Sequence, residues 1–505
     1  MILQTNWLNK LKAGLIQSQE YVMVTLIILL GLIIRLGLLL NTVDFHGISN
    51  GKIIQALLII NNPGNLGYWT PVHPPAHFLF VIAGLKLFAP LVIAPRIISL
   101  GFGLMTIFTA YLYLKLKFNR EIALFSILGI SLYSLHIIYS IIGTSETSFH
   151  FFLLCSLYVY EVFKLKQKRY LLSILGLCVG MASMCRYEGL LLIPFYFVFL
   201  GKEKKQLFEF TIYALIIPAI WMLVNYSAFG NAFKFIQSNN FIIPFQLNWM
   251  RQQGIRVEFF DKLFFWPKSL IKTLGVGVFS FGVFGLGAAV FKREKKLLSS
   301  LFLMFFAVFV LNTIKETLYL QPRYGITLGL ILIPFSIYFF YETVGTRNKI
   351  ISRTIILIML WTMIIPIKEQ ILTTPLSAPL FARNTALYLA NNAETIEYII
   401  IDDCGDEKYR EPIKVLSKIN PKFFILMPKS INLKGDYLID EKQFFKALNA
   451  NNVTTLVYSP YGGLNDILKL NSEAETQQRQ NFLFTLKYKS DPYYIYEIKR
   501  VVKNE

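Results

Sequence analysis

The sequence predicts a polytopic α-helical membrane protein with about eleven transmembrane helices over residues 1–369, followed by a small α/β domain over residues 370–505. Two observations predict the membrane part. Of the 505 residues, 55% are hydrophobic, with a mean hydropathy of +0.51, and apolar runs long enough to cross a bilayer recur along the chain. From residue 370 onward, short strand-like and helix-like segments replace these runs, which predicts the second domain.

The first crossing is expected at residues 21–40. Met1–Glu20 is polar and mildly basic and shows no small-residue cleavage site of a signal peptide. The segment 189–200 is shorter than the roughly 20 residues of a straight crossing, so it extends into its neighbours or breaks at Pro194. The eleven expected crossings are 21–40, 97–114, 121–141, 147–163, 170–185, 189–200, 207–224, 271–291, 298–314, 325–341 and 353–368.

Lysine and arginine clusters between these segments predict the orientation. They share one side, which should be the cytoplasm, if eleven spans cross and 76–93 lies in the interface or re-enters. The amino terminus is then cytoplasmic, and the first loop (41–96), the long loop (225–270) and the domain 370–505 are extracytoplasmic, in an inner or plasma membrane. The clusters are Lys10/Lys12, Lys115/Lys117/Arg120, Lys164/Lys166/Lys168/Arg169, Lys202/Lys204/Lys205, Lys292/Arg293/Lys295/Lys296 and Arg347/Lys349/Arg353.

The net charge of +20 belongs almost entirely to the membrane part. Residues 370–505 hold 17 Lys+Arg against 16 Asp+Glu, whereas residues 1–369 hold 33 against 14. Membrane orientation explains this excess, and no nucleic-acid motif accompanies it, so no nucleic-acid partner is expected. The four cysteines form no CxxC pair, which excludes a disulfide framework and a thiolate zinc cluster on spacing grounds.

In the carboxyl-terminal region, buried strands are expected at 397–403, 422–428 and 453–459. A helix at 440–452 separates the last two strands, and strands that alternate with helices predict a parallel sheet. A closing hairpin is expected around Ser490–Pro492.

The stretch 41–77 carries the most unusual chemistry for a membrane surface. Asp44 follows the first apolar run, and a carboxylate there suits a general base acting on an acceptor hydroxyl; the ordinary alternative is a polar connecting loop. His46 lies two residues further on. His73 and His77 flank Pro74–Pro75, and a divalent metal held by these two histidines stays open as an alternative to no metal at all.

Three further turns on the same expected face carry ionisable residues, which are functional candidates at a membrane boundary. Glu146 in GTSET is a candidate catalytic residue that holds a substrate hydroxyl or positions a basic group; alternatively it caps a helix. Arg186 and Glu188 in CRYEG form a binding pair or a local ion pair. Arg323, followed by Tyr324, in QPRYG presents a guanidinium fork that suits phosphate, or it anchors the helix at the headgroups.

Taken in order, the first-loop acid, His-Pro-Pro, TSET, RYEG, FGNAF (229–233) and PRY motifs resemble the GT-C superfamily of glycosyltransferases. More narrowly, residues from about 20 to 370 resemble the protein O-mannosyltransferase and aminoarabinose-transferase group, glycosyltransferase family 39. The resemblance implies inverting sugar transfer from a polyprenyl-phosphate donor to a hydroxyl of a lipid, glycan or protein acceptor, on the non-cytoplasmic face. It requires no cofactor.

The resemblance also implies roles for individual residues. Asp44 matches the first-loop acid, the expected base, and Glu146 stands where relatives often have Asp. Arg323 with Tyr324 matches the late arginine that meets the lipid phosphate, and Arg186 is the alternative carrier of that role. His46, His73, His77 and Glu188 are expected near the substrate. Some relatives carry Glu-Lys-Pro-Pro at the His-Pro-Pro turn, and Val72 here replaces the acid, which argues against an aminoarabinose-like metal site.

Two other classes of protein remain as alternatives. A lipid-linked-sugar transporter or flippase should show internal symmetry and broken helices near mid-bilayer, which the sequence lacks. A non-catalytic envelope-assembly protein would leave the charged residues scattered. The positions of the charged side chains distinguish the three classes of protein. An enzyme needs Asp44, Glu146, Arg186 and Arg323 to converge on one cavity.

Overall fold

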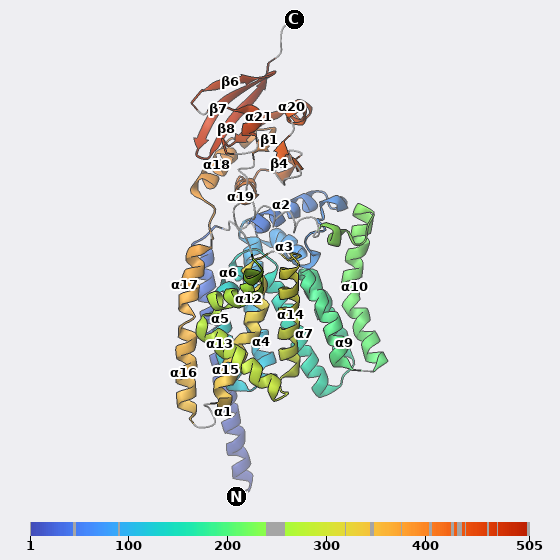
Figure 1. The fold of residues 1–505 in the computed structure, drawn as a ribbon, viewed down its shortest axis with the longest axis vertical. Coiled ribbons are helices and arrows are strands. Elements are labelled where there is room, and N and C mark those ends of the chain that lie inside the picture. The colour runs from blue at the N-terminus through green and yellow to red at the C-terminus, as the bar shows by residue number, and fades with distance from the viewer. Residues whose placement is uncertain are drawn as a thin grey trace. The chain divides into compact units, whose positions relative to one another are not determined.

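In a computed structural model, the helices and strands fall into two compact units, which Figure 1 traces along the chain. One unit comprises residues 1–41, 71–77 and 96–374; the other comprises 42–70, 78–95 and 375–505. The expected domain boundary at 369/370 stays a prediction, and in this division most of the first loop groups with the carboxyl-terminal region. The structure describes residues 2–43, 47–88, 91–201, 203–238, 258–318, 320–343, 348–374, 376–402, 407–425, 429–431, 437–439, 441–461, 464–471 and 473–501.

The first unit is helical throughout. Seven of its described helices are long and apolar enough to cross a membrane, and the bent pair α5–α6 makes up to eight. Its helices are α1 (Ile2–Leu40), α4 (Ala94–Lys117), α5 (Arg120–Ser131), α6 (Ser134–Ile141), α7 (Glu146–Lys166), α8 (Tyr170–Cys185), η2 (Tyr187–Leu191), α9 (Leu192–Leu200), α10 (Lys204–Phe229), α12 (Phe259–Leu274), α13 (Val276–Phe291), α14 (Lys296–Ile314), η3 (Pro322–Gly325), α15 (Ile326–Thr343), α16 (Lys349–Trp361) and α17 (Ile364–Thr373).

A polytopic helical membrane protein is therefore confirmed, whereas the count of eleven crossings stays a prediction. Each of the eleven expected segments is helical, but 170–185, 189–200 and 271–291 coincide with shorter apolar helices of 10–17 residues. The last of these was expected as one helix and is interrupted at Gly275, whose φ of +83° interrupts the helical backbone between α12 and α13.

Two expected boundaries were wrong. The segment 225–270 is not a loop throughout, since α10 continues to Phe229 and α12 begins at Phe259; residues 239–257 lie outside the described part. Apolar side chains on one face of α12, among them Trp266 and Leu270, are buried inside the first unit and stabilise this helix. The final expected span also extends further, to Thr373 at the end of α17.

The helix expected within 76–93 forms as α3 (Pro75–Leu87), which is 13 residues long. A straight crossing needs roughly 20 residues, so α3 is too short to span by itself. Its start follows from Pro74–Pro75, because proline is favoured in the first turn of a helix.

Glycines allow neighbouring helices of the first unit to approach closely. Gly176 and Gly180 on α8 face the backbone of α10, where a Cβ would lie 2.7 Å from Phe210 O and 3.0 Å from Ala214 O. Gly285 on α13 meets α15 at Phe335 in the same way. In lipid there is no hydrophobic driving force between helices, so van der Waals packing holds them together. Small residues at these crossings allow the close approach that such packing needs.

The bend between α5 and α6 is 59° and is supported from α1. Arg35, fully buried, donates from Nη1 to Ser131 O at 3.1 Å, and its Nη2 lies 2.9 Å from His136 Nδ1. The arginine thereby satisfies a carbonyl at the break in the helix. The bend leads the chain into the turn that precedes Glu146.

The second unit contains a mixed six-stranded sheet in the order β2-β1-β5-β8-β7-β6. The expected parallel strands form, because β1 pairs parallel with both β2 and β5, and the expected closing hairpin forms between β7 and β8. The sheet as a whole is mixed, because β8 pairs antiparallel with β5 and β7, and β7 pairs antiparallel with β6. The six strands of this sheet are β1 (Tyr398–Ile401), β2 (Phe424–Ile425), β5 (Val453–Tyr458), β6 (Thr476–Arg479), β7 (Phe482–Ser490) and β8 (Tyr493–Arg500). A separate two-stranded sheet is formed by β3 (Lys429–Ile431) and β4 (Tyr437–Ile439).

Helices cover both faces of this sheet. Ile400 joins one apolar cluster with Phe444 of α20, whereas its neighbours Ile399 and Ile401 join another with Ala386 of α18. This alternation follows from the period of two in a strand. The helices of this unit are α2 (Gly47–Asn61), η1 (Leu66–Tyr68), α3 beyond residue 77, α18 (Leu380–Asn391), η4 (Ala393–Thr395), α19 (Glu407–Leu416), η5 (Pro421–Phe423), α20 (Glu441–Ala450) and α21 (Asn465–Leu468).

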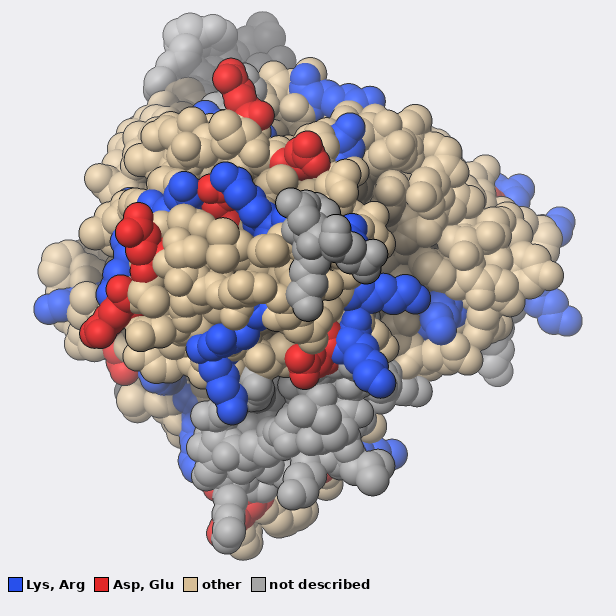
Figure 2. Space-filling view, turned by 90° about the horizontal axis from the view of Figure 1, so that it is seen from above, with Lys and Arg blue, Asp and Glu red and all other residues tan. Residues whose placement is uncertain are grey.

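Charged side chains of both signs lie interspersed on the face drawn in Figure 2, several of them beside one another. Blue basic and red acidic residues alternate on this face, without a continuous basic stripe.

Candidate active site

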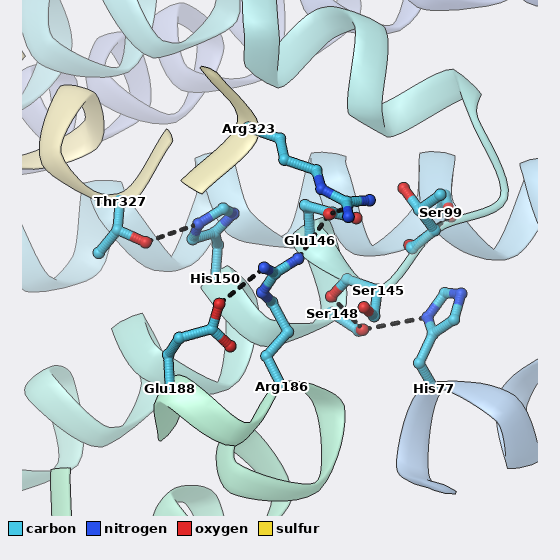
Figure 3. A network of polar contacts seen from close by, with 11 residues as sticks. His77, Ser99, Ser145, Glu146, Ser148, His150, Arg186, Glu188, Arg323 and Thr327 are labelled. Atoms are coloured by element: carbon cyan, nitrogen blue, oxygen red, sulfur yellow. Dashed lines mark hydrogen bonds and ion pairs between the residues drawn. The ribbon is translucent and has the colours of Figure 1, made fainter. Parts of the chain in front are cut away.

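Three turns of the first unit bring together four of the predicted site residues. Glu146 opens α7, Arg186 and Glu188 lie at the junction of α8 and η2, and Arg323 lies in η3. Figure 3 shows the two arginines approaching Glu146 from opposite sides, with Glu188 beside Arg186. We call these four residues the charge cluster.

The contacts within the charge cluster are unequal. Arg186 Nη1 lies 2.5 Å from Glu146 Oε1, and Arg186 Nη2 lies 2.7 Å from Glu188 Oε1. Arg323 Nη1 lies 3.6 Å from the same Glu146 oxygen. The side chains of Glu146, Arg186 and Arg323 are only 2%, 11% and 12% exposed, so these charges interact with little screening by water.

Tyr324 contacts both arginines through its ring. The ring centroid lies 4.8 Å from Arg186 Cζ and 5.4 Å from Arg323 Cζ, within cation–π range. Burial by itself would lower the pKa of Arg186, but the carboxylates of Glu188 and Glu146 raise the pKa above its usual value. Arg186 is therefore firmly cationic.

The backbone before Glu146 is held by α4. Arg96 Nε donates to Ile141 O at 2.7 Å, and Ser99 Oγ donates to Thr144 O at 3.1 Å. Both α4 side chains are buried. They fix the turn that ends at Ser145, so the start of α7, and with it Glu146, has a defined position.

The turn that carries Arg323 is supported by α12. Trp266, fully buried, donates from Nε1 to Thr313 Oγ1 at 3.0 Å, and Gly325 lies over its ring. Lys262 Nζ, at the start of α12, lies 2.6 Å from Glu316 Oε1 in the segment leading to η3. The helix between Phe259 and Leu274 thus places the PRY turn.

His73 and His77 occupy different positions at the start of α3. His73 precedes the helix, whereas His77 lies in its first turn, buried, with Nδ1 3.1 Å from Ser148 Oγ. Ser148 in turn donates to Ser145 O at 2.9 Å, which links His77 to the turn before Glu146. Across the described residues, no group of three His, Cys, Asp or Glu side chains is placed to hold a metal ion.

Tyr187 connects three segments of the first unit. Its hydroxyl donates to Pro71 O at 2.8 Å and accepts from Trp221 Nε1 at 3.1 Å, while its ring stacks on Phe235 at 4.8 Å. The next but one residue, Gly189, permits this arrangement, because a Cβ there would lie 2.5 Å from Ser183 N. Sequence reasoning missed Tyr187, although its place inside the RYEG motif is a signal.

His150 is a second residue whose surroundings the sequence did not indicate. It is buried, and its Nε2 lies 3.0 Å from Thr327 Oγ1 of α15. It follows Glu146 by four residues on α7, which places both side chains on one helical face. That spacing is the signal that would have associated it with the charge cluster (Figure 3).

Asp44 and His46 lie outside the described residues. Glu146, Arg186 and Arg323 lie together as ion pairs. That these three residues and Asp44 converge on one cavity stays a prediction. The scattered arrangement expected of an envelope-assembly protein is not what these three residues show.

Comparison with known proteins finds one family model that matches part of the chain, and one shared fold. Residues 72–227 match the model of the dolichyl-phosphate-mannose-protein mannosyltransferase family. Among curated proteins, none matches this chain.

Among solved structures, the chain is similar to ArnT from Cupriavidus metallidurans and to the Archaeoglobus fulgidus oligosaccharyltransferase. ArnT bound to undecaprenyl phosphate aligns with a TM-score of 0.66 at 12% identity, over 94% of this chain and 97% of that one. In the apo state, ArnT gives 0.60 at 11% identity, over 95% and 98%. The oligosaccharyltransferase, tethered with an acceptor peptide, gives 0.60 at 12% identity, over 87% and 69%. These likenesses show the fold.

Proposed function

We propose that this chain, whose residues 72–227 match the dolichyl-phosphate-mannose-protein mannosyltransferase model, is a membrane glycosyltransferase that moves a sugar from a polyprenyl-phosphate donor to an acceptor hydroxyl. The donor class is supported by the ArnT structure, which was solved bound to undecaprenyl phosphate. The acceptor is a lipid, glycan or protein, and transfer takes place on the non-cytoplasmic face, with eleven crossings and a cytoplasmic amino terminus.

The observation that carries this proposal is the buried charge cluster, and above all Arg323. Its guanidinium lies at the start of α15, and its Nε has no hydrogen-bond partner among the described residues. A planar fork beside a helix start suits a phosphate oxygen. We assign Arg323 to the donor phosphate, assisted by Tyr324, whose ring lies against it.

In the proposed step, the acceptor oxygen attacks the anomeric carbon and inverts it. The bond between that carbon and the phosphate oxygen breaks, and its electron pair leaves with the lipid phosphate. The acceptor proton passes to Asp44, the proposed general base. Since negative charge grows on the phosphate, a fixed guanidinium at Arg323 stabilises the transition state more than the bound donor.

In this proposal, Glu146 does not act as a base. One of its oxygens is shared by Arg186 and Arg323, and a carboxylate held by two guanidiniums is a weak proton acceptor. We therefore assign Glu146 to placing the arginines. Glu188 holds Arg186 from the other side, which leaves Arg323 as the less engaged cation.

The test is transfer by the purified protein in liposomes with a panel of radiolabelled polyprenyl-phosphate sugars. We expect one sugar to move from lipid to a hydroxyl acceptor, with release of polyprenyl phosphate. Movement of an intact lipid-linked sugar across the bilayer, without release of polyprenyl phosphate, would instead identify a flippase. No change in any donor would identify an envelope-assembly protein.

A further inference from the structure

The charge cluster is already electrically balanced before any donor arrives. Its two guanidiniums, Arg186 and Arg323, face two carboxylates, Glu146 and Glu188, in a largely buried setting. An incoming phosphate brings further negative charge into this setting. Like charges at short range in a weakly screened site repel strongly, so one existing contact must open when the phosphate binds.

The weakest contact identifies which pair opens. Arg186 holds Glu146 and Glu188 at 2.5 and 2.7 Å, both of them hydrogen-bonded. Arg323 lies 3.6 Å from Glu146, beyond hydrogen-bond distance, and among the described residues its Nε has no hydrogen-bond partner. Separating Arg323 from Glu146 therefore breaks no hydrogen bond, whereas freeing Arg186 would break two.

Glu146 retains a strong partner when that contact opens. Its Oε1 stays bonded to Arg186, whose other nitrogen stays bonded to Glu188. The carboxylate is thus not left as an isolated buried charge, which would be costly. Arg323 can exchange one anion for another while the rest of the charge cluster keeps its contacts.

We propose that the Glu146 carboxylate stands in for the donor phosphate at Arg323 in the resting enzyme and competes with it, so that Glu146 limits how tightly polyprenyl phosphate is held. This inference rests on the proposed function. The competition lowers the affinity for the bound donor. It also favours release of the phosphomonoester product, which carries more negative charge than the phosphodiester donor.

The test is the binding of undecaprenyl phosphate to the purified full-length protein in nanodiscs. Glu146→Gln removes the competing charge, so we expect undecaprenyl phosphate to bind about tenfold more tightly or better. Glu161→Gln is the matched control, because it removes the same charge from a carboxylate of the same helix, α7, that pairs with Lys117 instead of an arginine of the charge cluster. We expect it to change the affinity by less than about threefold.

The double variant Glu146→Gln/Arg323→Ala separates this competition from a general charge effect. We expect it to bind no more tightly than Arg323→Ala alone, because the competition acts through Arg323. In turnover, Glu146→Gln should lower both the KM for the donor and kcat, since product release becomes slower. Thermal unfolding checks each variant, and Glu146→Ala replaces Glu146→Gln if the latter does not fold.

Three results would overturn the inference. In the first, Glu146→Gln and Glu146→Ala each fold but bind undecaprenyl phosphate no more tightly than the parent. Alternatively, Glu161→Gln would tighten binding as much as Glu146→Gln does, or the gain would persist without Arg323. Failure of the proposed function looks different, because then Arg323→Ala alone would leave the affinity for undecaprenyl phosphate unchanged.

Discussion

A single carboxylate oxygen organises the chemistry at the scale of residues. Glu146 Oε1 lies within ion-pair distance of Arg186 and Arg323, which come from turns more than a hundred residues apart in the chain. A buried carboxylate between two guanidiniums stabilises both cations where water cannot. The arginines therefore have fixed positions before any substrate arrives, which is what stabilisation of a developing phosphate charge requires.

Asp44 is the residue whose substitution should affect the chemical step most directly. We expect Asp44→Asn to lower turnover by about 10²–10⁴-fold, because the amide cannot accept the acceptor's proton. Binding of undecaprenyl phosphate and the unfolding temperature should stay close to those of the parent. Turnover within a factor of two of the parent would remove Asp44 from the mechanism.

Tyr187 should matter through position. Tyr187→Phe removes the hydroxyl that joins Pro71 O and Trp221 Nε1, and leaves these polar groups in a part-buried setting. We expect a loss of about 1–3 kcal/mol in the free energy of unfolding, measured by chemical denaturation in detergent.

Tyr226→Phe, at a tyrosine that is 62% exposed on α10, is the control for that loss. It should leave the free energy of unfolding nearly unchanged. Equal stability of the Tyr187 and Tyr226 variants would show that the hydroxyl of Tyr187 contributes nothing.

The sequence indicated the charged members of the site but not their supports. Glu146, Arg186 and Arg323 each end or begin an apolar run, where a charge is conspicuous. For Tyr187 and His150 the sequence offers only a place in a motif and a spacing, and it does not reveal their partners. Those partners, Pro71 and Thr327, lie 116 and 177 residues away along the chain. Only the packing of helices brings these pairs together.

At the scale of elements, short turns between helices carry the site and glycine shapes one of them. In η2, Gly189 packs so closely on α8 that a Cβ would lie 2.5 Å from Ser183 N and 2.6 Å from Ala182 C. Both of these are backbone atoms and cannot move aside easily. The turn that holds Arg186 and Glu188 therefore depends on the absence of a side chain at Gly189.

We expect Gly189→Ala to shift this turn and to lower both the unfolding temperature and turnover, by about tenfold or more for turnover. Gly287→Ala is the control, because a Cβ on that residue of α13 meets nothing within 4 Å and alanine favours a helix. If the two variants were equally active and equally stable, the close approach at Gly189 would have no consequence.

Element types were predictable where periodicity is strong, and boundaries were not. The parallel strands β1, β2 and β5 alternate with helices, which the sequence pattern reveals. The antiparallel half of the sheet depends on which edge β8 joins, and β8 pairs with β5 as well as with β7. The sequence predicts the hairpin of β7 and β8, but no local pattern specifies that β8 pairs with β5.

At the scale of the whole molecule, hydropathy predicted the membrane class but leaves the number of crossings open. Seven helices, or eight with the bent pair, pass by length and composition, and three expected crossings are short apolar helices. A short helix crosses only if its neighbours or the bilayer adapt, which depends on lipid and packing rather than on local sequence.

The orientation is testable by labelling single cysteines at positions 165 and 430 in intact cells, after Cys155, Cys178, Cys185 and Cys404 are replaced. We expect a membrane-impermeant thiol reagent to reach position 430 from outside and position 165 only after the membrane is opened. Labelling of position 430 only from the cytoplasm would reverse the orientation and, with it, the proposed side of transfer.

The central claim is that Arg323 holds the donor phosphate, and the turnover of Arg323→Lys tests it most directly. Lysine keeps the charge and loses the planar fork, so we expect turnover with the polyprenyl-phosphate sugar to fall by about 10²-fold, and further for Arg323→Ala. Arg383→Lys, at an exposed position on α18, is the matched control and should turn over like the parent. If folded Arg323→Lys also turns over like the parent, a positive charge suffices there and the phosphate is held elsewhere.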